Sequence, residues 1–126
     1  MSAFRLTRAG AVDLEFTGEC LADLSSRESN TQPRWSEVRI YRTESGKYVT
    51  EMVGRSIVPG EIDRINVQVV EQAEGIREAL ARKGDNRHTK VPGNPNRPYL
   101  TELAIEAMQA AGEKDEAIAA TLVERI

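Results

Sequence analysis

Residues 35–56 read WSEVRIYRTESGKYVTEMVGRS, and they carry the strongest local structural signal in the sequence. Two runs of β-forming residues flank TESGK, a spacing that predicts a bulged hairpin with Gly46 in the left-handed conformation after a type I turn. Counting outward from this turn sets Arg39 against Glu51. Opposite charges across a strand pair favour that register.

Further strands are expected on both sides of the hairpin. Alternate residues are apolar from Leu14 to Leu24, which predicts a long strand with one buried face. Phe4 and Leu6 predict a short strand before it. A Pro59–Gly60 turn then leads into a strand that carries Ile65, Val67 and Val69 on one face.

Helical periodicity begins at Val70 and continues through Ala73, Ile76 and Leu80. Thr101 and Asp115 are suitable N-caps for two later helices, and Gly112 lies between them. The pattern predicts an α+β fold, an antiparallel four- to five-stranded sheet followed by three helices packed on one face. A single domain over 1–126 is expected, with sheet at 1–70, helix at 71–83, a mobile basic loop at 84–98 and a helical hairpin at 99–126.

Composition limits the function classes. The chain has 126 residues, a net charge of −3, one cysteine (Cys20) and one histidine (His88). An internal disulfide, a CxxC redox pair and the zinc motifs are therefore excluded. The sequence has no apolar run of membrane-spanning length and no signal-peptide pattern, so a cytoplasmic protein is expected.

Four stretches, GECLADLSS, RWSEVRIYRTESGKYVTEMVGRS, PGEIDR and PYLTELAIEAM, carry a family resemblance. The chain resembles small uncharacterised accessory proteins of proteobacterial plasmids, prophages and integrative elements. This resemblance covers most of the chain except residues 84–98. It implies a mobile-element origin and an accessory role, and it brings no catalytic residues.

No residue pattern indicates catalysis. Cys20 with His88 as its base would be a nucleophile, but Cys20 shares an apolar strand pattern with Phe16, and free cysteine is most often buried. Glu15, Glu19 and Asp23 are expected on the outward face of their strand as solubility charges. We therefore expect no enzyme activity, no cofactor and no metal site.

The region 82–97 is basic. It could track a nucleic-acid backbone, or it could be a solvated loop, since it lacks the aromatic residues that stack on bases. The candidate nucleic-acid-binding residues are Arg82, Lys83, Arg87, Lys90 and Arg97.

The second face of the hairpin combines aromatic and arginine side chains, which are enriched in binding hot spots. The candidate partner-binding residues are Trp35, Arg39, Tyr41, Val49, Val53 and Arg55. The alternative is that this face is also buried. The leading hypothesis is a non-enzymatic protein-interaction module, a mobile-element accessory factor that binds and modulates a host or element protein, or that self-associates. The alternative hypothesis is a nucleic-acid-binding regulatory protein that uses residues 82–97.

Overall fold

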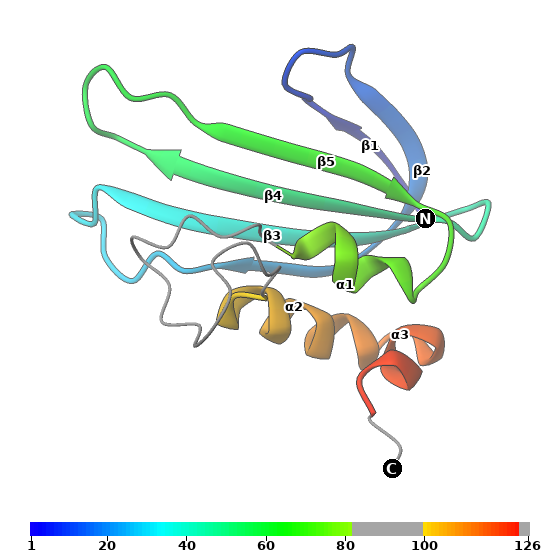
Figure 1. Ribbon diagram of the computed structural model, residues 1–126. Helices are drawn as coiled ribbons and strands as arrows, with labels where there is room; N and C mark the ends of the chain where they lie inside the picture. Colours follow the sequence, from blue (N-terminus) through cyan, green and yellow to red (C-terminus); the bar gives the residue numbers. More distant parts are fainter. Residues whose placement is uncertain (82–99, 124–126) are drawn as a thin grey trace.

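The computed structural model describes residues 1–81 and 100–123 of the chain. Five strands precede three helices in this part of the chain, as the sequence predicts (Figure 1). The elements are β1 (Ser2–Leu6), β2 (Leu14–Ser25), β3 (Arg34–Thr43), β4 (Tyr48–Ser56), β5 (Arg64–Val70), α1 (Gly75–Leu80), α2 (Glu102–Gly112) and α3 (Glu116–Thr121).

The strands form one antiparallel sheet in the order β1-β2-β3-β4-β5. The predicted register of the β3–β4 hairpin is confirmed, with Arg39 opposite Glu51 and Trp35 opposite Arg55. Gly46 has a φ of 87°, the left-handed conformation that the bulged turn requires. The turn before β5 is also confirmed, because Glu61 N–H donates to the Val58 carbonyl at 3.1 Å.

A β-bulge at Leu21 divides β2 into two halves. Cys20 pairs with Tyr41 and Ala22 pairs with Ile40, so Leu21 is the extra residue. The bulge shifts the alternation by one residue, and bulges also increase strand bending. The expectation of one buried face from Leu14 to Leu24 is therefore wrong, because the two halves bury their apolar side chains on opposite faces of the sheet.

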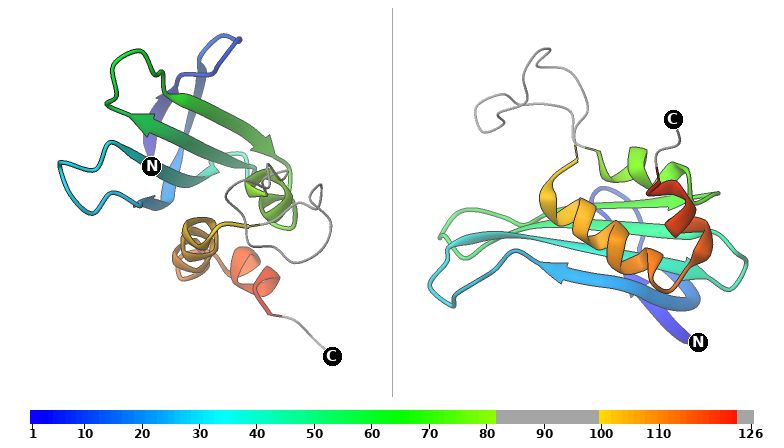
Figure 2. Two further views of the ribbon diagram at one scale, coloured as in Figure 1. Left: turned by 60° about the vertical axis from the view of Figure 1, so that its left-hand side comes forward. Right: turned by 90° about the horizontal axis from the view of Figure 1, so that it is seen from below.

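All three helices pack on one face of the sheet, as expected (Figure 2). α2 lies against β2 and β3, and α1 lies against β4 and β5. The main hydrophobic cluster fills this layer. Its fully buried large side chains are Leu21, Val38, Ile40, Ile76, Leu80, Met108 and Ile118.

The first helix is shorter than the predicted range of 71–83. Val70 is the last residue of β5, and α1 ends at Leu80. Ala73, Ile76 and Leu80 are nevertheless buried, as their spacing indicates. Val70 is the last residue of β5, and Ala73 lies in the turn that follows. Both residues therefore reach the core although no helix connects them.

Both predicted N-caps are confirmed. Thr101 Oγ1 accepts from Ala104 N–H at 3.2 Å, and Asp115 Oδ1 accepts from Ala117 N–H and Ile118 N–H at 2.9 and 3.1 Å. The second oxygen of Asp115 accepts from Tyr48 Oη and from Arg42 Nη1, each at 2.9 Å. The buried carboxylate of Asp115 therefore caps α3 and also links the helical hairpin to the sheet through hydrogen bonds.

Candidate functional site

The predicted partner-binding residues do lie on the sheet face opposite the helices, but part of that patch is buried. Tyr41 is 4% exposed, and Val49 and Val53 are each 1% exposed. β1 and the first half of β2 bend away from the helices and cover this end of the face (Figure 1). The Tyr41 ring lies 4.8 Å from the Phe4 ring and 5.2 Å from the Phe16 ring, measured between centroids.

Tyr41 and Val49 thus belong to a second hydrophobic cluster with Leu6. The expectation that they contribute to an exposed patch is wrong, and so is that expectation for Val53. The alternation of side chains correctly predicts on which sheet face these residues lie. It cannot predict that another strand covers that face.

The remaining patch residues belong to a charged network centred on Glu37. Its carboxylate accepts from Arg39 Nη2 at 2.6 Å, from Trp35 Nε1 at 2.9 Å and from Arg55 Nε at 3.0 Å. Arg39 also pairs with Glu51 at 3.0 Å. Burial of Glu37 raises the pKa of its carboxyl, but these three donors outweigh burial and bring the pKa to about 2.

Trp35 is half-buried between an anionic and a cationic side chain. Its indole N–H donates to Glu37, and the Arg27 guanidinium carbon lies 3.9 Å from the centroid of its ring. Such stacking is a cation–π contact. Trp35 is therefore fixed in place and only partly available to a partner.

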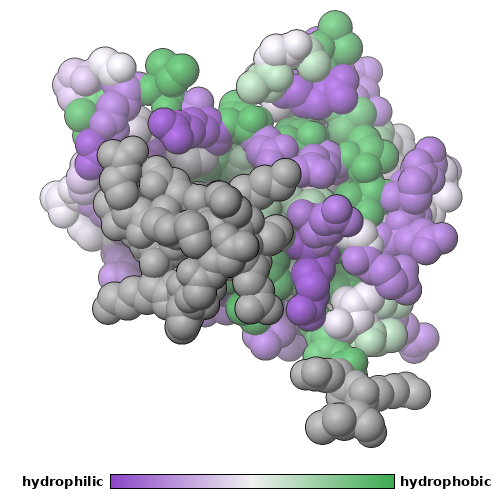
Figure 3. All heavy atoms as spheres, in the orientation of Figure 1, coloured by the Kyte–Doolittle hydropathy of each residue, from purple (hydrophilic) through white to green (hydrophobic). Residues whose placement is uncertain are grey.

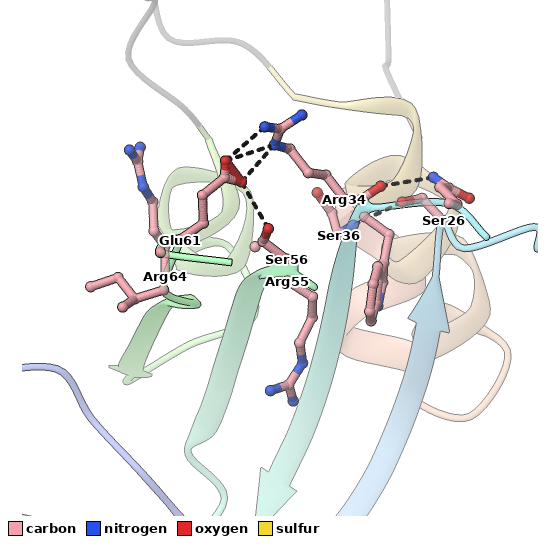
Figure 4. A pocket seen from close by; sticks show the side chains of 12 residues that line it. Ser26, Arg34, Ser36, Arg55, Ser56, Glu61 and Arg64 are labelled. Carbon is pink, nitrogen blue, oxygen red and sulfur yellow. Dashed lines mark hydrogen bonds and ion pairs between the residues drawn. The ribbon is translucent and has the colours of Figure 1, made fainter. Parts of the chain in front are cut away.

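A wide, open pocket of about 870 Å³ lies at the end of the sheet where β3 begins and β4 ends (Figure 4). Arginine and serine side chains dominate its polar lining, and Trp35, Ile62 and Gly54 supply apolar surface. The charged and hydroxyl-bearing lining residues are Ser26, Arg34, Ser36, Arg55, Ser56, Glu61 and Arg64.

Inside this pocket a carboxylate is already held. Arg34 donates from Nε to Glu61 Oε1 and from Nη2 to Glu61 Oε2, both at 2.7 Å, and Ser56 Oγ donates to Oε1 at 2.7 Å (Figure 4). The hydrogen bonds from Arg34 and then Ser56 bring the pKa of Glu61 to about 2. The pocket thus offers a carboxylate two groups of donors, the fork of an arginine guanidinium and a serine hydroxyl.

Arg55 and Arg64 complete the cationic lining. Arg55 is paired with Glu37 and with Asp63, the latter at 2.9 Å. Arg64 makes no ion pair within residues 1–81 and 100–123. It is exposed, and its positive charge contributes to lowering the pKa of Glu61.

The sequence did not identify Arg34, Glu61, Arg64 or Glu37 as site residues. Glu37 shares a strand face with Trp35 and Arg39, so alternation could have found it. Arg34 and Glu61 are 27 positions apart, and they meet because the turn before β5 lies beside the start of β3. No local pattern predicts that meeting.

Cys20 is a poor nucleophile in this setting. Burial raises the pKa of its thiol, the nearby Asp23 raises it further, and Cys20 Sγ donates to the Ala22 carbonyl at 3.4 Å. The thiol form therefore dominates at neutral pH. His88, its suggested base, lies outside the described residues.

The three carboxylates predicted to share one outward face are separated by the bulge. Glu15 and Glu19 precede Leu21, and Glu19 pairs with Arg42 at 2.8 Å. Asp23 follows Leu21 and pairs with Arg39 at 3.0 Å on the opposite sheet face. The shared-face expectation is therefore wrong for Asp23.

The basic candidates Arg82, Lys83, Arg87, Lys90 and Arg97 all lie outside the described residues, as does the loop predicted at 84–98. Their nucleic-acid role stays a prediction. Within the described ranges, no group of three or more His, Cys, Asp or Glu side chains is arranged to hold a metal ion. No helix in that part of the chain is long and apolar enough to cross a membrane.

Comparison with known proteins adds no relative, since no family model, no curated protein and no solved structure matches this chain.

Proposed function

We propose that this protein is a non-enzymatic interaction module that binds an acidic segment of a protein partner in the pocket at the end of the sheet. The proposal rests on the hydrogen bonds that the pocket already makes to the carboxylate of Glu61. An arginine fork and a serine hydroxyl hold one carboxylate there, and Arg64 lies beside it without an acidic partner in the described chain.

The chemistry of the lining supports a carboxylate-bearing partner. Guanidinium groups recognise carboxylates through paired hydrogen bonds. Arg34 and Arg55 already have acidic partners, whereas Arg64 has none among the described residues. Ile62 is 84% exposed at the rim, where it offers apolar contact beside the charges. A host-encoded or element-encoded partner agrees with the accessory role that the family resemblance implies.

The carboxylates of this region favour binding over catalysis. Glu37 and Glu61 each have a pKa of about 2, so both remain ionised near neutral pH. A general acid or base works best with a pKa near the operating pH. These two groups therefore act as fixed charges that orient arginines.

The test measures binding of a fluorescent oligoglutamate peptide by anisotropy, with oligoglutamine of the same length as the uncharged reference. Wild-type protein should bind oligoglutamate and not oligoglutamine. Arg64→Gln should weaken binding by about ten-fold, the loss of one charge-assisted contact. Arg5→Gln, the same charge change on β1, should leave binding unchanged.

Equal binding of the two peptides, or equal losses in Arg64→Gln and Arg5→Gln, would contradict the pocket assignment. Single-stranded and duplex DNA of matched charge form a second arm. Tighter, steeply salt-dependent binding of DNA would favour the nucleic-acid hypothesis instead.

A further inference from the structure

β5 is an edge strand. It pairs with β4 on one side and is last in the strand order of the described sheet. Half of its backbone N–H and C=O groups therefore point outward from the sheet, which is a template for pairing with another strand.

β5 lacks the features that usually protect an edge. Its sequence is RINVQVV, with no proline and no charge after Arg64, and its pairing with β4 runs without a bulge. β1 at the opposite edge has Arg5 within the strand, before its last residue, and Arg5 pairs with Asp13 at 3.0 Å. Charged side chains at an edge oppose strand addition, so the two edges of this sheet differ in kind.

The β5 sequence is complementary to itself in an antiparallel register centred on Val67. Ile65 then faces Val69 of a second copy, and Asn66 faces Gln68. The apolar residues meet on one sheet face and the two amides meet on the other, where amide groups can donate and accept. Arg64 falls at the two far ends of the paired strands, where the two positive charges are well separated.

The side chains along β5 are available for such pairing. Val69 is 47% exposed, and Asn66 and Gln68 are exposed on the helix-bearing face. Val67 already packs against the second hydrophobic cluster. Figure 3 shows apolar surface, in green, interspersed with polar surface, in purple, on the side of the molecule that carries the sheet.

α1 leaves the outer edge of β5 accessible. Gln68 Nε2 donates to the Ala79 carbonyl at 3.3 Å, which places α1 against a face of β5. Figure 1 shows α1 beneath the sheet, whereas strand addition takes place within the plane of the sheet.

We infer that β5 pairs antiparallel with β5 of a second copy of this chain, centred on Val67, so that the two five-stranded sheets become one continuous sheet. Such an interface is isologous, with the same strand contributed by each copy. This inference does not rest on the acidic-segment pocket, because neither Asn66 nor Gln68 lines that pocket.

The test uses two double variants at the same exposed positions. Asn66→Glu with Gln68→Glu places like charges across both amide pairs of the dimer. Asn66→Lys with Gln68→Glu places opposite charges there. Both variants lose the Gln68 contact to Ala79, so the pair differs only in the charge at position 66.

Sedimentation velocity over a concentration series should show a dimer for the full wild-type chain and for Asn66→Lys with Gln68→Glu. The doubly acidic variant should dissociate at least about ten-fold more easily than the oppositely charged variant. Far-UV circular dichroism confirms that both variants are folded. A monomeric wild type, or equal dissociation of the two double variants, would overturn the inference.

Discussion

Tyr41 and Trp35 lie on the same face of β3, but their surroundings differ. Tyr41 is enclosed by the rings of Phe4 and Phe16, whereas Trp35 is half-buried between Arg27 and Glu37. Residue type and the shared strand face together predict both as hot-spot candidates. Only the bending of β1 over the sheet separates a core aromatic from a surface aromatic.

Truncation of the two aromatics should therefore have unequal costs. Tyr41→Ala should lower the free energy of unfolding by about 3–5 kcal/mol, the usual cost of removing a buried aromatic ring. Trp35→Ala should cost about 1–2 kcal/mol, because its ring is only partly buried. Chemical denaturation measures both. Tyr41→Phe is the control and should be nearly neutral, since no hydrogen bond of the Tyr41 hydroxyl occurs among the described residues.

Asp115 makes stability depend on pH. Burial of Asp115 raises the pKa of its carboxyl, but hydrogen bonds from Ile118, Tyr48 and Arg42 outweigh burial and lower it. A carboxylate with a lowered folded-state pKa stabilises the fold above its unfolded-state pKa, and that contribution is lost as the pH falls through the lowered value.

Asp115→Asn tests this charge, since asparagine still caps a helix. At pH 7 the variant should be less stable than wild type by about 2–4 kcal/mol. The gap should begin to narrow below about pH 4, where the carboxyl of the unfolded chain becomes protonated, and should close as the pH falls through the lowered folded-state pKa. Denaturant midpoints between pH 2 and 7 give the gap; a gap constant across this range would contradict the assigned role.

At the scale of elements, the backbones of β2 and β3 lie close together at Gly18. Gly18 lies opposite Thr43, and a Cβ at Gly18 would overlap the carbonyl oxygen of Arg42. Backbone atoms of a central strand cannot move aside as the end of a side chain can.

Gly18→Ala should therefore lower the free energy of unfolding by at least about 2 kcal/mol. Gly54→Ala is the matched control within β4, because its added Cβ would lie 3.8 Å from the Arg64 Cβ, an ordinary contact. That variant should stay within about 1 kcal/mol of wild type. Similar denaturation midpoints for the two variants would show that β2 has room at Gly18.

Local chemistry explains which elements the sequence could predict. The β3–β4 register follows from the turn at Gly46, and the caps at Thr101 and Asp115 are short-range signals. The bulge at Leu21 has no local signal, because alternate residues stay apolar on both sides of it. The pocket forms where Arg34 and Glu61 come together. Their contact joins distant parts of the chain, so no local pattern predicts it.

At the scale of the whole molecule, one sheet supports a hydrophobic cluster on each face. Ile40 belongs to the cluster under the helices, and Val49 belongs to the cluster beneath β1. Both clusters rest on β3 and β4. We therefore expect the two layers to unfold together.

Ile40→Ala and Val49→Ala test that cooperativity. Each should lower the unfolding midpoint, with a cost of about 2–5 kcal/mol for Ile40 and less for Val49, which loses one carbon atom fewer. The fluorescence of Trp35, the single tryptophan, should follow the same transition as far-UV circular dichroism in both variants. Separate transitions for the two probes would show that the faces unfold independently.

The bulge at Leu21 gives β2 one position where its length can change. Loss of Leu21 would leave Cys20 opposite Tyr41 and Ala22 opposite Ile40, with each side chain still on its present face. A deletion farther along the strand would invert every side chain between the deletion and the bulge. Over evolutionary time, insertions and deletions in β2 are therefore expected to accumulate next to Leu21, while the number of residues in each half stays fixed.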